Sequence, residues 1–501
     1  MLGEYVSFSD SILFKLSKLS WKRGNDNFYI EKIPFSFSSG NEYASFCTNL
    51  VSSFSEIMKS PLRILECGSG NGIFAKKMIT KLKLKNLQFN YTLTEFSHAL
   101  IESYSEWISD LENVESGFLD ILNPKDIVPY NVAILTYLLD TVPCKCLRFS
   151  KNQLFEQKVC ITLKENAKLT NSFDFPFKDF TLNELNMFLN ESIEDQQISL
   201  ISRLQDIINI EWKQFPISVS EFEFSEILSE WLGQKENIDK DFYFNYSDHY
   251  FHIFNNLRHF SSSEFMFICY DFATPVNEKI TQFDTLYGKF GACYFNNINF
   301  DLLKFYCNKH NLGFVSSNYP NAENQVAVIT SVKNKRLLRL FDQQMLLPEP
   351  GVLSYNWVKK FDASKDVLSL HQLIKESQRE LSEDALADYV YRFSLAKKFY
   401  SLLSYENALI YVDMILSDYG NLALDVLILN SKILRKQHYY KDALQLLNNV
   451  VDSTTYYELL YLELIFIYAE LNDVSNFQKA IRLYFKHFTT NPQWQLAEMI
   501  K

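Results

Sequence analysis

The feature that most constrains the fold is a glycine-rich turn between an apolar strand and a helix. Of only 13 glycines in 501 residues, three fall in the run ECGSGNG, at Gly68, Gly70 and Gly72. This run follows the strand-like LRILE and opens the helix-like IFAKKMITKL. Glycines let the backbone turn sharply beside a ligand, and the free N–H groups of a helix start attract a carboxylate or phosphate. The turn therefore predicts an α/β fold with a ligand site after its first strand.

Strand-like and helix-like segments alternate around this turn. Strands are predicted at 62–66, 89–95 and 132–136, and helices at 73–84 and 97–111. Such alternation is typical of a parallel sheet covered by helices.

The pattern is less regular after residue 150. Residues 182–212 and 219–232 have helical spacing, although 159–163 could be a strand. Strand patterns return further on, at 265–271, 314–317 and 325–331.

The spacing of the glycines separates two classes of cofactor. A dinucleotide loop needs G-x-G-x-x-G, but Ile73 stands where its third glycine would be. The next predicted strand ends in Glu95, where a carboxylate can accept both ribose hydroxyls of an adenosine. Asp120, in SGFLDIL, fits a residue that reads the adenine amino group. A plain tight turn, a helix-capping Glu95 and a solvated turn at Asp120 are the alternatives.

The motifs resemble those of the MidA-like family of class I S-adenosylmethionine-dependent methyltransferases. ECGSGNG is similar to the family's E-L-G-P-G-R-G, and TEFSHAL is similar to V-E-x-S-P-x-L. TYLLDTVP, from Thr136 to Pro143, matches N-E-F-x-D-A-L-P, and FICYDF matches an apolar strand ending in D-Y-G. NNINFDLLKFYCNKHNLGF resembles the family's V-D-F-x-x-L helix, so the resemblance extends over roughly 40–335 in the correct order.

The resemblance implies a seven-stranded, Rossmann-like class I methyltransferase sheet with a helical insertion, which in this chain corresponds to about 165–260. It also implies S-adenosyl-L-methionine as the cofactor. The residues implied for its binding are Glu66, Gly68, Gly70, Gly72, Glu95, Asp120 and Thr136.

Methyl transfer from a sulfonium is an in-line displacement, so alignment of the reactants supplies most of the catalysis. A nitrogen acceptor also needs a group that orients it or holds it unprotonated. Asp140 and Asp271 are the candidates, each at the carboxyl end of a predicted strand, with the Tyr137 hydroxyl as a third. Either aspartate could instead cap a helix. The histidines form no pair at metal-ligand spacing, and this transfer needs no metal.

Two departures from the family motifs bear on activity. Thr136 and Tyr137 replace the Asn-Glu pair, and Phe272 replaces the glycine of D-Y-G. The alternative to an active enzyme is therefore a catalytically retired scaffold that binds the cofactor or a partner. A second alternative is a small-molecule methyltransferase.

Three segments near the carboxyl end align with one another. In each, an alanine follows an aromatic residue by three positions, and the spacing between segments is close to the roughly 34 residues of a tetratricopeptide repeat. The aligned residues are Tyr405 and Ala408, Tyr440 and Ala443, and Phe477 and Ala480. A plain helical bundle is the alternative. Stacked helical pairs form a groove suited to a protein, so we expect this tail to recruit a protein substrate or partner.

These patterns predict four parts. Residues 1–60 are an N-terminal helical segment of the catalytic domain, and 61–335 are the methyltransferase domain. A linker at 336–383, with a break at Pro348–Gly351, leads to the tetratricopeptide-like repeats at 384–501.

Composition limits the partners. The net charge of −11, with no dense Lys/Arg stripe, argues against nucleic acid. No apolar run reaches the roughly 18–20 residues that span a bilayer, and the first residues resemble neither a secretory signal nor a transit peptide. The eight cysteines are scattered, which favours reduced thiols. We expect a cytoplasmic protein; the sequence leaves its oligomeric state open.

Overall fold

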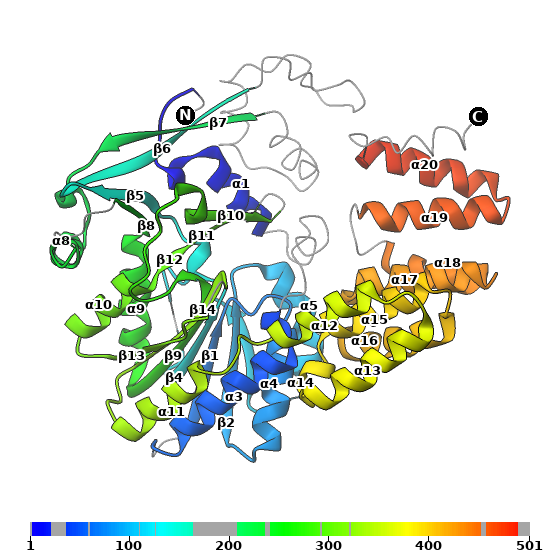
Figure 1. The fold of residues 1–501 in the computed structure, drawn as a ribbon, viewed down its shortest axis with the longest axis horizontal. Helices are drawn as coiled ribbons and strands as arrows, with labels where there is room; N and C mark the ends of the chain where they lie inside the picture. The colour runs from blue at the N-terminus through cyan, green and yellow to red at the C-terminus, as the bar shows by residue number, and fades with distance from the viewer. Residues whose placement is uncertain are drawn as a thin grey trace. The chain divides into compact units, whose positions relative to one another are not determined.

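The computed structural model describes residues 3–21, 37–58, 61–109, 111–125, 127–163, 208–235, 241–290, 293–319, 322–451 and 457–488. The chain forms two compact units (Figure 1); the first holds the described residues up to Val352, and the second those from Leu353 onward. In these ranges, no helix combines the length and the apolar character needed to cross a bilayer. The first unit is mixed α/β and the second is helical, as the sequence predicts.

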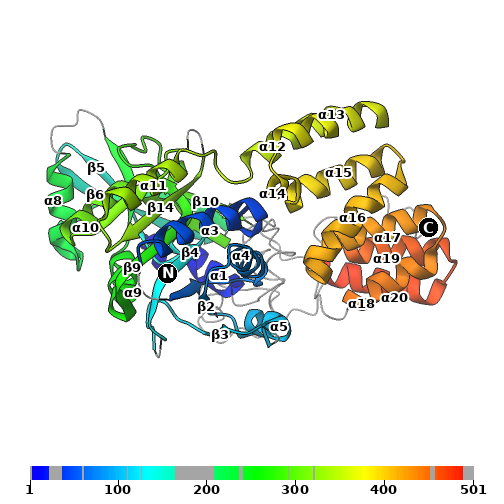
Figure 2. The ribbon, with the colours of Figure 1, turned by 90° about the horizontal axis from the view of Figure 1, so that it is seen from below.

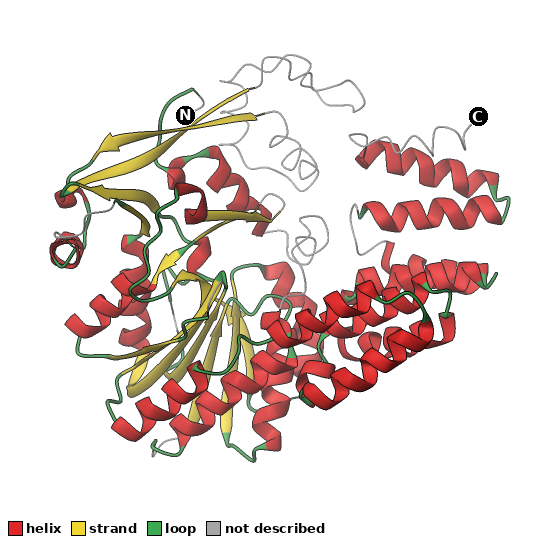
Figure 3. Ribbon diagram, in the orientation of Figure 1, coloured by secondary structure: helices red, strands yellow, loops and turns green. Residues whose placement is uncertain are grey.

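A large sheet forms the centre of the first unit (Figure 3). Its strand order is β13-β14-β9-β4-β1-β2-β3, and β12 pairs with β9 to give eight strands. The five strands from β9 to β3 are parallel, whereas β14 runs antiparallel to both β9 and β13. The strands are β1 (Leu62–Cys67), β2 (Phe89–Glu95), β3 (Val114–Phe118), β4 (Tyr130–Thr136), β9 (Ser261–Thr274), β12 (Ile298–Asn299), β13 (Gly313–Ser316) and β14 (Asn324–Thr330).

The central strands are apolar on both faces because each face is covered. In β9, Met266 and Ile268 belong to one hydrophobic core, whereas Phe267 and Cys269 belong to the other. The first core is completed by α3 (Asn41–Ser55), α4 (Ile73–Leu84), α5 (His98–Ser109) and α11 (Lys335–Met345). The second is completed by α8 (Ser225–Gly233), α9 (Asp248–Phe260) and α10 (Phe300–Lys309). Figures 1 and 2 show α3 and α11 on one side of the sheet and α9 and α10 on the other.

Local signals set the bounds of α4. Gly72 has φ +75° immediately before the helix, and Asn86 has φ +55° just after it. Glycine and asparagine tolerate this left-handed conformation better than other residues, so both ends of the helix are specified by its own sequence. The structure confirms the predicted helix 73–84 and the predicted strand 89–95.

The region predicted as a helical insertion, at about 165–260, supplies two strands, β7 and β8, of an antiparallel sheet. Its order is β7-β6-β5-β8, formed by β5 (Lys145–Ser150), β6 (Gln153–Leu163), β7 (Ile208–Pro216) and β8 (Phe242–Tyr246). The helical prediction is therefore wrong at 208–212, where β7 pairs with β6. Alternation in INIEWKQFP is the strand signal that the helical interpretation missed. The predicted helix at 219–232 is confirmed from Ser225 onward, in α8, whereas 219–221 form the 3-10 helix η5 (Val219–Glu221). The rest of the 182–212 prediction, before Ile208, lies outside the described residues.

Smaller elements surround this antiparallel sheet. Val6 forms an isolated bridge with Val159 in β6, near the start of the described chain. The other elements of the first unit are η1 (Phe8–Asp10), α1 (Ile12–Trp21), η2 (Phe37–Ser39), η3 (Leu139–Thr141), η5 (Val219–Glu221), η6 (Phe283–Leu286), β10 (Tyr287–Phe290) and β11 (Cys293–Asn296).

The second unit consists of helices in its described residues. Its elements are α12 (Val352–Ala363), α13 (Val367–Glu380), α14 (Glu383–Leu386), α15 (Tyr389–Ser401), α16 (Tyr405–Tyr419), η7 (Gly420–Leu422), α17 (Leu424–Lys436), α18 (Tyr440–Val451), α19 (Glu458–Glu470) and α20 (Val474–Phe488). The stretch 336–383, predicted as a linker, thus contains α12, α13 and most of α11. Ala408, Ala443 and Ala480 are buried in α16, α18 and α20, each the second helix of a helix pair.

Candidate functional site

The glycine turn between β1 and α4 is held against the neighbouring strand β2. Gly68, Gly70 and Gly72 all have positive φ, at +75°, +56° and +75°. The N–H groups of Gly68 and Ser69 donate to the Thr94 carbonyl, each at 2.9 Å. A Cβ on Gly72 would lie 3.1 Å from the Trp107 ring, so both conformation and space favour glycine there.

Glu95 closes the turn from the end of β2. Its Oε2 accepts from the Gly70 N–H at 2.9 Å, and its Oε1 accepts from the Phe96 and Ser97 N–H groups at 2.7 and 3.3 Å. Burial raises the pKa of Glu95, while these three N–H groups act in the opposite direction. The structure therefore brings together the turn and the carboxylate that the sequence predicts for one adenosine site.

Glu66 lies beneath the turn and is almost fully buried. The Tyr91 hydroxyl donates to its Oε2 at 2.7 Å. Burial raises the pKa of Glu66 to about 8, and the hydrogen bond from Tyr91 lowers it only partly. Below that pH the buried side chain is neutral, which lessens the cost of keeping it out of water.

Asp120 follows β3, next to the end of β2, because the Leu119 N–H donates to the Glu95 carbonyl at 3.1 Å. Its Oδ1 accepts from the Leu122 N–H at 3.0 Å, and its Oδ2 accepts from the Asn123 amide at 3.3 Å. The carboxylate is thus engaged with its own turn. This arrangement corresponds to the solvated-turn alternative and leaves the adenine role as a prediction.

Three aromatic residues near Glu95 were missed by the sequence analysis. Phe96 and Phe118 are 37% and 49% exposed, with ring centroids 5.6 Å apart. The His98 ring stacks on Phe118 at 5.0 Å. Exposed aromatic faces at the ends of two adjacent strands can stack on a flat ring such as adenine. The sequence signal was an aromatic residue directly after Glu95.

The loop after β4 approaches the glycine turn. The Thr136 hydroxyl hydrogen-bonds the Tyr43 hydroxyl at 3.0 Å. A Cβ on Gly68 would lie 3.3 Å from Cδ1 of Leu138, so this loop borders the turn. Tyr137 has φ +49°, and its N–H donates to the Tyr270 carbonyl at 2.9 Å. Burial raises the pKa of Tyr137 well above its ordinary value, so its hydroxyl stays protonated near neutral pH.

Asp140 and Asp271 form a buried pair, with Asp140 in η3 after β4 and Asp271 three residues before the end of β9. Oδ2 of Asp271 accepts from the Leu138 and Leu139 N–H groups at 3.2 and 2.9 Å, and its Oδ1 accepts from the Phe272 N–H at 3.0 Å. Among the described residues, Oδ1 of Asp140 has no hydrogen-bond partner.

The two carboxyl groups of this pair influence each other. Burial raises the pKa of Asp271 to about 7, against the lowering effect of backbone N–H groups. Burial, and next the charge of Asp271, raise the pKa of Asp140 well above its ordinary value. Two adjacent buried carboxyl groups resist double ionisation, so this pair retains a proton near neutral pH.

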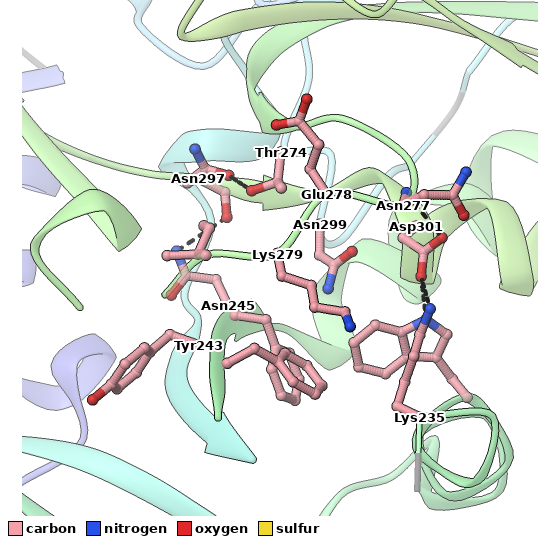
Figure 4. Close-up of a pocket in the computed structure, with 14 residues that line it drawn as sticks. Lys235, Tyr243, Asn245, Thr274, Asn277, Glu278, Lys279, Asn297, Asn299 and Asp301 are labelled. Atoms are coloured by element: carbon pink, nitrogen blue, oxygen red, sulfur yellow. Dashed lines mark hydrogen bonds and ion pairs between the residues drawn. The ribbon is translucent and has the colours of Figure 1, made fainter. Parts of the chain in front are cut away.

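A separate polar pocket lies near β8 and the loop after β9 (Figure 4). Lys235 points toward Asp301, with Nζ and Oδ2 2.7 Å apart, and the Trp231 Nε1 donates to the same oxygen at 3.0 Å. None of the lining residues belongs to the glycine turn. The free volume is about 20 Å³, which suits about one water molecule and excludes a nucleoside-sized ligand.

Comparisons with known proteins point to the same segment. Residues 45–237 match a family described as "Putative S-adenosyl-L-methionine-dependent methyltransferase". No curated protein is significantly similar to the chain. Two solved structures from Burkholderia thailandensis each cover 66% of this chain and 89% of their own length, at 11% and 12% identity. Their TM-scores are 0.41 and 0.38, and the second has S-adenosyl-homocysteine bound; because both scores are below 0.5, we infer nothing about this chain from them.

The matched segment contains the glycine turn, Glu95 and the loop after β4, which are the parts that the sequence analysis assigned to one cofactor. The segment from 45 to 237 is thus similar to a family of methyltransferases whose cofactor is S-adenosyl-L-methionine, as the sequence predicts.

Proposed function

We propose that the first unit is a class I S-adenosylmethionine-dependent methyltransferase of the MidA-like type, acting on a protein that the helical tail recruits. The observation that carries this proposal is the contact between Glu95 and the Gly70 N–H, which joins an acidic strand end to a glycine turn. The strand order, with β14 antiparallel in an otherwise parallel core, supports the class I assignment.

The residues of the turn fit an adenosine carrying an amino-acid chain. Glu95 can exchange its bonds to Phe96 and Ser97 for ribose hydroxyls, because it lies at the strand end and is not fully buried. Exposed Phe96 and Phe118 offer aromatic faces for the adenine. Glu66, Gly68, Gly72, Asp120 and Thr136 complete the proposed donor site.

The cofactor supplies an electrophilic methyl group, and the chain supplies alignment and control of protons. Asp271 holds the backbone of the loop that carries Tyr137 and Asp140. This loop borders Gly68, so an acceptor bound beside it lies near the donor site. Tyr137, Asp140 and Asp271 remain the candidates for orienting or deprotonating the acceptor.

Three helix pairs support the proposal of tetratricopeptide-like repeats. Ala408, Ala443 and Ala480 are buried in the second helix of each pair, where a small side chain allows close packing. Stacked pairs of this kind bind peptides and protein surfaces.

A second candidate is a protein that binds the donor without transferring its methyl group. It is favoured by the burial of Asp140 and Asp271 and by the commitment of Asp271 to three backbone N–H groups.

The test is transfer of a tritiated methyl group from S-adenosylmethionine to an extract divided into protein and small-molecule fractions. We expect label in protein, lost in Gly70→Ala, whose φ of +56° disfavours a side chain, and retained in Gly117→Ala, which has open space. Label only among small molecules would support the small-molecule alternative. Donor binding with no label in either fraction would support the non-catalytic candidate.

Recruitment by the tail is tested with a chain ending at Val352 that still binds S-adenosylhomocysteine. We expect it to lose protein labelling. Unchanged labelling would remove the tail from substrate recruitment.

A further inference from the structure

Glu349 lies at the edge of the sheet that also carries the glycine turn and the loop after β4. The parallel pairing of β4 and β9 sets Thr136 opposite Tyr270, and the pairing of β9 and β14 sets Phe272 opposite Asn324. The first residue of β14 is therefore at the same edge as the last residue of β4. Glu349, in the turn PEPG that follows α11, contacts both β9 and β14 at this edge.

Glu349 is held in a defined orientation. Its Oε1 accepts from the Tyr270 hydroxyl at 3.0 Å and from Nδ2 of Asn324 at 3.2 Å. The turn itself is fixed two residues later, because Gly351 N–H donates to Oε2 of Glu42 in α3 at 2.8 Å. One carboxylate oxygen is thus used for positioning.

Two oxygen atoms at this place have no hydrogen donor within the described part of the chain. Both hydrogen bonds of Glu349 go to Oε1, which leaves Oε2 available. The Oδ1 of Asn324 is buried and unpartnered. A buried carbonyl oxygen without a hydrogen-bond donor is unfavourable, so a ligand with N–H groups would be stabilised by donating to it.

Aromatic rings pack around Tyr270, whose hydroxyl binds Glu349. The Tyr137 ring is 5.4 Å from the Tyr270 ring and 5.2 Å from the Phe272 ring. Phe272 in turn stacks on Phe295 at 3.9 Å. Aromatic faces next to a carboxylate attract a cation through both the ring quadrupole and the charge.

We propose that Glu349 is the residue that binds the methyl acceptor, and that the acceptor presents an ammonium or guanidinium group to Glu349 and the Tyr137 ring. This inference rests on the proposed function, in which the glycine turn binds the methyl donor. Leu138, next to Tyr137, borders that turn at Gly68, so an acceptor at Tyr137 lies near the donor. Glu349 accepts from the nitrogen, Asn324 Oδ1 accepts a second N–H, and Tyr137 covers one face. The acceptor is thus selected by charge and by hydrogen-bond donors.

The experiment is a calorimetric titration of the full-length chain with butylguanidine, butylamine and butyrate, with and without saturating S-adenosylhomocysteine. We expect at least one of the cations to bind and butyrate not to bind. Glu349→Gln keeps the shape and removes the charge, so it weakens cation binding by about tenfold or more. Glu115→Gln removes an exposed carboxylate on β3, away from the contacts of Glu349, and serves as the control, with no change expected.

The outcomes separate the two proposals. Unaltered binding of S-adenosylhomocysteine in Glu349→Gln, together with lost cation binding, supports the acceptor site. Equal cation binding by wild type and Glu349→Gln, or tighter binding of butyrate, overturns it while leaving the donor site intact. Absence of S-adenosylhomocysteine binding overturns the proposed function instead, and the titrations without it still report on Glu349.

Discussion

At the residue scale, a few positions combine a required conformation with a required chemistry. Gly72 needs both positive φ and the absence of a Cβ, and Glu95 combines a strand-end position with a bond to Gly70. Both were predictable because their signals are local. The contacts of Glu349 were not, since they join a turn to strands far away in the sequence and no local pattern marks them.

Replacing Gly72 with alanine tests the conformational requirement. Left-handed backbone costs a non-glycine residue about 1–3 kcal/mol, and the new Cβ would press on Trp107 and Tyr104. We expect urea unfolding to show a loss of stability in this range, together with weaker binding of S-adenosylhomocysteine. Gly117→Ala is the control, since its φ is not positive and its surroundings are open. Equal stability of the two variants would contradict the strain argument.

The buried Glu66 predicts a pH dependence of stability. Its pKa is raised from about 4.5 unfolded to about 8 folded, so the folded state binds the proton more tightly. The stabilisation of the folded state by protonated Glu66 is complete below the unfolded pKa, and it is lost as the pH rises through the folded pKa of about 8. We expect Glu66→Gln to show a smaller decline in unfolding free energy between pH 5 and pH 8 than wild type. Parallel curves for both proteins would show that Glu66 does not titrate in this range.

At the element scale, helices and strands marked by signals within their own sequence were predicted correctly, whereas a strand defined by its distant partner was missed. The bounds of α4 and β2 were predicted correctly because a glycine turn, apolar periodicity and stop signals lie within each segment. The strand β7 was missed because its pairing with β6 joins segments separated by a long stretch of chain. The apolar pattern near 208–212 fits both a helical period and a strand period, and only pairing with the partner strand decides between them.

Asp271, within β9, links this strand to the loop after β4. An asparagine there can still accept hydrogen bonds at one atom, but its NH₂ group would face a backbone N–H. We expect Asp271→Asn to lower the unfolding free energy by about 1–3 kcal/mol at neutral pH. Asp140→Asn is the comparison, and a smaller loss is expected because Oδ1 of Asp140 has no partner among the described residues. A larger loss in Asp140→Asn would reverse this assignment.

At the scale of the whole molecule, two compact units carry separate tasks in the proposed account. The α/β nature of the first and the helical nature of the second were predictable from the change in hydrophobic period. The helices within 336–383 were not, because Pro348 and Gly351 suggested a break and packing determines the rest. Buried alanines in three successive helix pairs explain why the sequence repeats could be recognised.

Arg435 tests whether the units behave independently. Its guanidinium pairs with the buried Glu463, with Nε and Oε1 2.6 Å apart, and also contacts Glu470. Arg435→Met leaves Glu463 buried without its cation, which costs about 3 kcal/mol or more. We expect the helical unit of this variant to unfold at a lower urea concentration than in wild type, and the affinity for S-adenosylhomocysteine to be unchanged. The neighbouring exposed Lys436→Met is the control, and a parallel loss of affinity in Arg435→Met would show that the units are coupled.

The central claim is that the glycine turn and Glu95 bind S-adenosylmethionine. The most direct measurement is calorimetric titration of the full-length protein with S-adenosylmethionine, comparing wild type with Glu95→Gln and with Glu115→Gln, an exposed carboxylate on β3. We predict micromolar binding by wild type and by Glu115→Gln, and at least about tenfold weaker binding by Glu95→Gln, since bonds to a charged acceptor contribute roughly 1.5–3 kcal/mol. No binding by the folded wild type, or equal affinity in all three proteins, would contradict the account.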